Sequence, residues 1–150
     1  MTDVMTPEQR KKAMRANRGR TRPERALAAL LWRRGLRYLA ADGYKARYGK
    51  AFTGNPDLIF SRNRVVVFVD GCFWHGCPTC QRVPADMSAF WLEKIRRNVE
   101  RDRRVTHQLR RSGWRVIRVW EHDLKGKQSL AARADALERR IAQKVGAHLG

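Results

Sequence analysis

The sequence of 150 residues predicts an α/β domain in which a mixed β-sheet is flanked by helices. Two short apolar runs, at residues 57–60 and 65–69, are separated by four polar residues, which is typical of a β-hairpin. A further strand at 114–120 follows a long helical segment, so it can return parallel to an earlier strand by a right-handed crossover. Because 43% of the residues are hydrophobic, we expect residues 1–150 to form a single domain around one core.

Two helices are expected before the hairpin. The pattern TPEQ at residues 6–9 combines a capping Thr, a first-turn Pro and a Gln three residues after the cap, so a helix should run to about residue 16. The pattern TRPE at 21–24 predicts a second helix over 22–34, ended by Gly35. Its buried face carries Leu27, Leu30 and Leu31. Between 36 and 53, three tyrosines alternate with basic residues without a clear period, which allows a strand and a loop.

The strand at 65–69 is apolar at every position, so we expect it at the sheet centre, buried on both faces. Asp86 or Ser88 can cap a long helix that stops at Gly113. The apolar stripe of this helix consists of Leu92, Ile95, Val99 and Leu109. A last helix over 129–145 has Leu130, Ala134, Leu137, Ile141 and Val145 at helical spacing. The expected order is therefore α-α-β-β-β-α-β-α.

Basic residues dominate the charge, since 33 Lys and Arg against 14 Asp and Glu give a formal net charge of +19. One interpretation is a solvated basic surface that resists aggregation. The excess is rich in arginine, however, whose planar guanidinium suits phosphate, and this favours a nucleic-acid partner. Charge does not distinguish DNA from RNA, or an enzyme from a binding module.

The sequence has no apolar run of the roughly 20 residues that a membrane span requires. Its first residues also lack the basic and then apolar pattern of a secretory signal. We expect a cytoplasmic protein, which would associate with the nucleoid if its nucleic-acid partner is DNA.

Three cysteines with the spacing Cys72-x4-Cys77-x2-Cys80 predict a structural zinc site. Tetrahedral zinc needs a fourth ligand, and His122 directly follows a strand, where its side chain can be aimed at a fixed point. This assignment leaves His75 for another role. The alternative is a set of free thiols, because an odd cysteine count in a cytoplasmic chain argues against disulfides.

Within the same loop, Phe73 and Trp74 are adjacent large aromatics beside a histidine. Neighbouring side chains of an extended segment point to opposite faces, so at least one of the two should be exposed. A wedge or stacking platform for bases and an ordinary core pair remain equally open.

Two aspartates lie at neighbouring ends of the predicted hairpin. Asp57 heads the first strand and Asp70 follows the second, so both carboxylates can converge on one point. Paired acids beside phosphate indicate a divalent cation, and His75 is close enough in sequence to act as general base or acid on metal-activated water. The alternative is that Asp57 and Asp70 are plain turn residues.

Several motifs in a fixed order resemble one known family. They are Asn55-Pro56-Asp57, VDGCFWHGC at 69–77, FWLEKI at 90–95, NVERD at 98–102, GWRV at 113–116 and Trp120-Glu121. The chain is similar through them to the very-short-patch repair (Vsr) endonucleases, a branch of the restriction-endonuclease-like nucleases. The likeness spans about residues 14–124, and it implies the restriction-endonuclease-like fold.

The resemblance implies a magnesium-dependent nick on the 5′ side of the thymine in a T:G mismatch, which arises by deamination of 5-methylcytosine. Asp57 would be the Mg²⁺-binding aspartate, with the Val69 carbonyl as a second ligand. His75 would be the catalytic histidine, and Glu24 would organise metal-bound water.

The resemblance also implies how mismatched double-stranded DNA is bound. Residues 1–20 would form an arm against the DNA, from which Met14 intrudes into one groove. Phe73, Trp74 and Trp91 would insert beside the mismatch from the other, while Lys94 and Asn98 would reach bases from one helix face. A mismatch-repair adaptor and a cytosine methyltransferase are the implied protein partners, and one nick implies a monomer.

The chain departs from the family pattern at two places. Asp70 stands where some members carry a histidine, so either that role is dispensable or Asp70 touches the metal or its water. Cys77 and His122 fall where other members have His and Cys, an exchange that a tetrahedral zinc site tolerates.

Two rival functions remain open. A restriction or mobile-element endonuclease on the same scaffold would cut both strands of undamaged sites. A zinc-dependent nucleic-acid-binding protein without chemistry would keep its function after Asp57→Ala.

Overall fold

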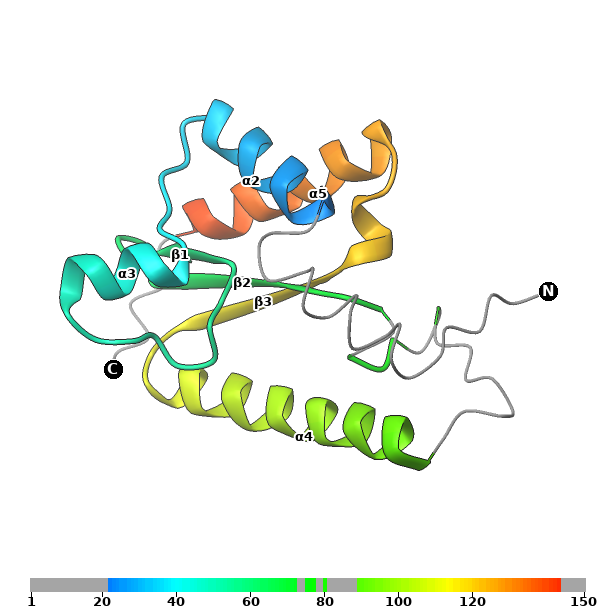
Figure 1. Cartoon of the computed structure of the whole chain (residues 1–150). Helices are drawn as coiled ribbons and strands as arrows, with labels where there is room; N and C mark the ends of the chain where they lie inside the picture. The colour runs from blue at the N-terminus through cyan, green and yellow to red at the C-terminus, as the bar shows by residue number, and fades with distance from the viewer. Residues whose placement is uncertain (1–21, 73–74, 78–79, 81–88, 144–150) are drawn as a thin grey trace.

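The computed structural model describes residues 22–72, 75–77, 80 and 89–143. A three-stranded sheet forms the middle layer, with two helices on one face and one long helix on the other (Figure 1). The α/β class and the mixed, helix-flanked sheet are thus confirmed. The expected helix at 6–16 and the residues Met14, Phe73, Trp74, Asp86, Ser88 and Val145 lie outside the described residues.

The sheet has the order β1-β2-β3. Strands β1 (Leu58–Phe60) and β2 (Val65–Asp70) form the predicted antiparallel hairpin, and β3 (Arg115–Trp120) runs parallel to β2. Every residue of β2 is buried, as its continuous apolar run predicted. The hairpin register places Asp57 beside the carboxyl end of β2, because the Asp57 N–H donates to the Val67 carbonyl at 3.0 Å.

Helices α2 (Arg22–Arg33) and α5 (Lys127–Ala142) cover one face of the sheet. Helix α2 ends where predicted, at Gly35 with a φ of 88°, a conformation that L side chains rarely adopt. A short 3-10 helix, η1 (Glu121–Leu124), joins β3 to α5. Of the residues expected on their buried faces, the two helices bury Leu27 and Leu31 from α2 and Ala134, Leu137 and Ile141 from α5, while Leu30 and Leu130 are half-buried against the same core.

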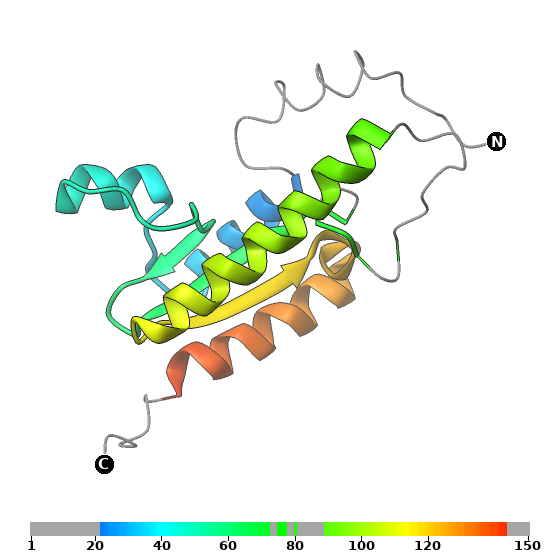
Figure 2. The same cartoon turned by 90° about the horizontal axis from the view of Figure 1, so that it is seen from below.

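Helix α4 (Ala89–Arg111) covers the opposite face and lies along β3 and β2 (Figure 2). Its predicted end before Gly113 is confirmed, but its buried stripe is rotated by one residue at the start of the described helix. Leu92 is 42% exposed, whereas Trp91 is 1% exposed. The prediction for Leu92 was wrong because the larger indole, four residues before buried Ile95, takes the inner position.

The expected strand between residues 36 and 53 was also wrong. The structure has helix α3 (Ala41–Tyr48) there, and only Leu39 pairs with the sheet, through a single bridge to Ile59. Helix α3 buries none of its residues and therefore has no apolar stripe from which a period could be read. It ends at Gly49 in the left-handed conformation, with a φ of 75°.

Alternation along the strands sends side chains to the two faces in turn. Val65, Val67 and Val69 of β2 pack in the core under α2 and α5, while Val66 and Phe68 pack in a smaller core that includes Leu109 of α4. Asp70 is the next residue on the α4 side of β2. Among the described helices, none has the length and apolarity needed to cross a membrane.

Candidate active site and metal centre

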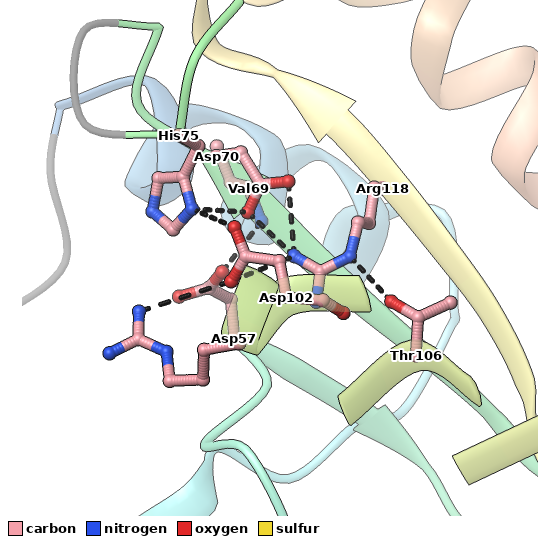
Figure 3. Close-up of polar contacts among 8 residues, drawn as sticks. Asp57, Val69, Asp70, His75, Asp102, Thr106 and Arg118 are labelled. Carbon is pink, nitrogen blue, oxygen red and sulfur yellow. Dashed lines mark hydrogen bonds and ion pairs between the residues drawn. The ribbon is translucent and has the colours of Figure 1, made fainter. Parts of the chain in front are cut away.

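A cavity of about 370 Å³ lies at the carboxyl end of β2, between the sheet and α4. All four residues predicted to take part in catalysis line it, from three separate segments of the chain: Glu24, Asp57, Asp70 and His75. Figure 3 shows Asp57, Asp70 and His75 gathered around Asp102 of α4. The structure therefore brings together residues that are up to 51 positions apart, from Glu24 to His75.

Asp57 is held at the edge of the cavity by its own loop and by β2. The Val69 N–H donates to Asp57 Oδ2 at 2.6 Å, which fixes the carboxylate beside the end of β2. Gly54 in the preceding loop has a φ of 81°, and a side chain there would overlap the Cγ1 atom of Val105 on α4. Close approach of this loop to α4 thus requires glycine.

His75 is held by a tight turn and by one carboxylate. Its N–H donates to the Gly71 carbonyl at 3.1 Å, and the Cys77 N–H donates to the Cys72 carbonyl at 3.0 Å. Its Nδ1 atom lies 2.5 Å from Oδ2 of Asp102. With Nδ1 donating to this carboxylate, the ring presents Nε2 as its second functional atom.

Asp102 is a site residue that the sequence reasoning missed. It lies within the NVERD motif, which does not by itself distinguish it from Glu100. The signal that could have found it is its place on the buried stripe of α4, seven residues after Ile95 and seven before Leu109, which predicts an inward-facing acid but not its partner.

Asp70, for which contact with the metal or its water was one alternative, pairs with Arg118 of β3. Its side chain is 6% exposed, and both of its oxygens accept hydrogen bonds from Nη1 of Arg118, at 3.0 and 3.1 Å. Oδ1 also lies 3.7 Å from Nδ1 of His75. Burial raises the pKa of Asp70, and the nearby charges of His75 and Arg118 act in the opposite direction.

The four predicted zinc ligands form a cluster, in which one ligand atom from each lies within 4.8 Å of the others. Nδ1 of His122 is 3.2 Å from the sulfur of Cys72, 3.6 Å from that of Cys77 and 3.3 Å from that of Cys80. Ligands bound to tetrahedral zinc at about 2.0–2.3 Å lie roughly 3.5 Å apart, so these distances fit the ion.

The surroundings of the cluster fit a metal as well. Burial raises the pKa of the Cys72 thiol to about 11, although contact with His122 counteracts this, so the thiolate there needs a cation to replace its proton. Nε2 of His122 lies 3.2 Å from Oδ1 of Asp123, an arrangement that orients a metal-binding imidazole. The cluster ties the loop after β2 to η1, and it anchors the turn that carries His75.

The outer face of α4 is the strongest candidate surface for nucleic acid. A groove of about 720 Å³ there contains both residues expected to reach bases, Lys94 and Asn98. Its other basic lining residues are Arg96, Arg97, Arg101 and Arg104. Trp91 is buried in this structure, so its expected insertion into DNA requires the indole to leave its packing site, whereas neighbouring Phe90 is 59% exposed.

Comparison with known proteins gives consistent relatives. Residues 2–82 match the sequence model of a family described as DNA mismatch endonuclease Vsr. The chain is 44% identical over 129 residues to the type II nicking enzyme V.NaeI of Lentzea aerocolonigenes, covering 85% of this chain and 76% of that one. It is 42% identical over 148 residues to the DNA mismatch endonuclease Vsr of Escherichia coli, covering 97% of this chain and 88% of that one.

Proposed function

The chain belongs to the Vsr family of DNA mismatch endonucleases, and from this we propose that it nicks one strand 5′ of the thymine in a T:G mismatch, in a magnesium-dependent reaction. The observation that carries the proposal is that Asp57, His75 and Glu24 line one and the same cavity. The type II nicking enzymes among its relatives support a nick in one strand.

The donor set at the cavity suits a hard divalent cation. The Asp57 carboxylate and the backbone carbonyl of Val69 are oxygen ligands of the kind Mg²⁺ prefers, and Glu24 lines the same space, where it would orient metal-bound water. A bound Mg²⁺ would polarise the scissile phosphate and make bound water more acidic.

His75 would act as the general base or acid on the attacking water. Its Nδ1 atom is engaged by Asp102, which fixes the tautomer and orientation of the ring and stabilises the imidazolium when Nε2 takes up a proton. Asp70 accepts hydrogen bonds from Arg118 and is not among the ligands that we propose for Mg²⁺. We therefore assign it a supporting role.

Mismatch preference would come from the cost of opening the duplex. A T:G pair unstacks more easily than a matched pair, so inserting Phe73, Trp74 and Trp91 costs less there. Lys94 and Asn98 would contact bases from the groove on α4, and Met14 would act from the other groove. The net charge of +19 would hold the DNA backbone.

We propose Zn²⁺ as the ion of the cluster formed by Cys72, Cys77, Cys80 and His122. Three thiolates and an imidazole are a common structural zinc set, and the ion would fix the loop that carries His75. We further propose that the protein acts as a monomer after a cytosine methyltransferase, and with a mismatch-repair adaptor.

The test is a strand-specific nicking assay on matched and T:G duplexes of one sequence, with and without Mg²⁺. We expect a single nick 5′ of the mispaired thymine, only with the metal and only in the T:G duplex. Equal cutting of both strands of both duplexes would instead support a restriction or mobile-element enzyme.

The variant Asp57→Ala distinguishes the enzyme from a binding protein. We expect nicking to be lost while DNA affinity, measured by fluorescence anisotropy, is largely retained. If the wild type binds T:G duplexes but never cleaves them, the catalytic proposal fails.

A further inference from the structure

We propose that Arg118 is a positioning residue, whose guanidinium holds Asp70 and Asp102 so that Asp102 is presented to His75. This inference rests on the proposed nicking function, because it concerns the same histidine. Arg118 is an arginine inside an otherwise apolar stretch of β3, between Ile117 and Val119, and neither charge nor periodicity explains it there.

The register of the sheet determines where Arg118 points. It pairs with Phe68 of β2, while Ile117 and Val119 on either side of it pack in the core under α2 and α5. Arg118 therefore faces α4, and its guanidinium carbon lies 4.1 Å from the centre of the Phe68 ring. Its side chain is 22% exposed, so solvent screens its interactions less than at an open surface.

The guanidinium contacts both the sheet and α4. Nη1 donates to both oxygens of Asp70, at 3.0 and 3.1 Å, and lies 3.9 Å from Oδ1 of Asp102. Nε donates to Oγ1 of Thr106 at 2.9 Å, and Nη2 donates to the backbone carbonyl of Asp102 at 3.3 Å. Asp102 and Thr106 are one helical turn apart, so a single side chain fixes this turn of α4 against the end of β2 (Figure 3).

The contacts to Asp102 leave one of its oxygens for the histidine. Oδ2 of Asp102 is the atom that lies 2.5 Å from Nδ1 of His75, whereas Arg118 engages the Oδ1 side and the backbone. Only a planar side chain with several donors can make these contacts together. Lysine would keep the positive charge but would lose the fork.

Charge gives a second reason for Arg118. One ligand atom each from Asp70, His75 and Asp102 lies within 4.8 Å of the others, so two carboxylates are crowded around one imidazole. Arg118 supplies the cation that keeps these carboxylates together. Its positive charge offsets the repulsion between them, and Asp102 stays available to the histidine.

The test compares Arg118→Met and Arg118→Lys in the zinc-loaded, full-length protein. We measure the single-turnover nicking rate on a T:G duplex and, separately, the DNA affinity. We expect Arg118→Met to lower the rate by about 10²-fold at unchanged affinity, because a catalytic group misplaced by about 1 Å costs that much. Arg118→Lys should recover part of the rate. An unchanged rate in Arg118→Met would overturn the proposal.

Arg115→Met is the matched control. Arg115 lies on the same strand but donates to the carbonyls of Arg140 and Ile141, away from the cavity. We expect this variant to lose stability and to keep its rate when folded. An equal loss of rate in both Met variants, in proportion to their loss of melting temperature, would make Arg118 merely structural and would overturn its positioning role.

An NMR measurement tests the inference independently of the nicking assay and of the Arg118→Met variant. The Nδ1–H proton of His75, donated to Asp102, should give a downfield signal in the wild type that shifts upfield or broadens in Arg118→Lys. The same signal in both proteins would contradict the proposal. If the wild type shows the Arg118-dependent signal but does not nick T:G duplexes, the proposed function fails while the positioning inference stands.

Discussion

The two faces of the sheet are built from the same strands but carry different residues. Under α2 and α5 the strands contribute apolar side chains, including Phe60, Val67 and Val119, and one exception, Arg115 at the start of β3, which donates to backbone carbonyls of α5. Toward α4 they contribute a small apolar core near the hairpin turn, followed by Asp70 and Arg118 near the carboxyl end of β2. The two sets alternate along each strand, so a shift of one residue in register would exchange them.

The comparison shows how a small domain separates stability from chemistry. A charged group removed from water is costly unless it is paired, and on the α4 face each of the buried or half-buried charges named above has a partner. On the α2 and α5 face Arg115 is the exception among apolar strand residues and lies away from the cavity, so this face is packed mainly for stability. We therefore expect substitutions on the two faces to affect different measurements.

The largest difference between the effect on nicking rate and the effect on stability is expected from Asp102→Asn. The amide cannot stabilise an imidazolium and favours the wrong orientation of the His75 ring, so the nicking rate should fall by about 10²–10⁴-fold, with little change in melting temperature. The control is Asp135→Asn, which removes an ion pair with Arg34 under the opposite face. Single-turnover kinetics on a T:G duplex check both, and a nearly normal rate in Asp102→Asn would contradict the assignment.

Removal of zinc should have an effect approaching that of Asp102→Asn. The cluster anchors the loop of His75, so a protein treated with a zinc chelator and assayed in Mg²⁺ should stop nicking and recover when Zn²⁺ is returned. Helices α2 and α5 should stay packed, so the far-ultraviolet circular dichroism of the protein should change little. If nicking is unchanged once Zn²⁺ has been shown to be absent, the ion does not hold the loop of His75 in place.

A core substitution should show the reverse pattern. Leu137 is 3% exposed within the core under α5, so Leu137→Ala should lower the free energy of unfolding by about 2–5 kcal/mol. Its nicking rate, measured well below the melting temperature, should match the wild type. Chemical denaturation measures the first quantity, and a tenfold loss of rate in the folded variant would show that the two faces are coupled.

The smallest effect is expected at the exposed surface of α4. Hydrogen bonding to Arg96 lowers the pKa of Glu93 from its ordinary value of 4.5 to about 2. A lowered carboxylate pKa stabilises the folded state above pH 4.5, and this contribution is lost as the pH falls toward 2. Glu93→Gln should therefore lower the melting temperature slightly at pH 7 in low salt. A difference that is unaffected by high salt would argue against an ion pair.

Much of the fold could be predicted from local patterns. The continuous apolar run of β2 indicated its central place, and Gly35 indicated the end of α2. Helix α3 could not be found in this way, since it buries no residues and shows no apolar period. Leu92 was misplaced because the choice between it and Trp91 depends on packing across the domain.

The site was predictable only in part. The cysteine spacing and the ends of the hairpin indicated the zinc cluster and the meeting of Asp57 with the loop of His75. Asp102 and Arg118 became evident only when α4 was seen to pack on the sheet, because their partners lie 27 and 48 residues away in sequence. Local periodicity contains no information about such distant pairs.

The central claim is that the α4 face holds a catalytic cation beside Asp57 and His75, separate from the cysteine cluster. Anomalous diffraction from a crystal soaked in Mn²⁺ tests it directly, because Mn²⁺ takes the oxygen ligands of Mg²⁺. We predict a Mn²⁺ peak bonded to the Asp57 carboxylate and the Val69 carbonyl oxygen. A peak between Asp70 and Asp102, with none at Asp57, would contradict the account.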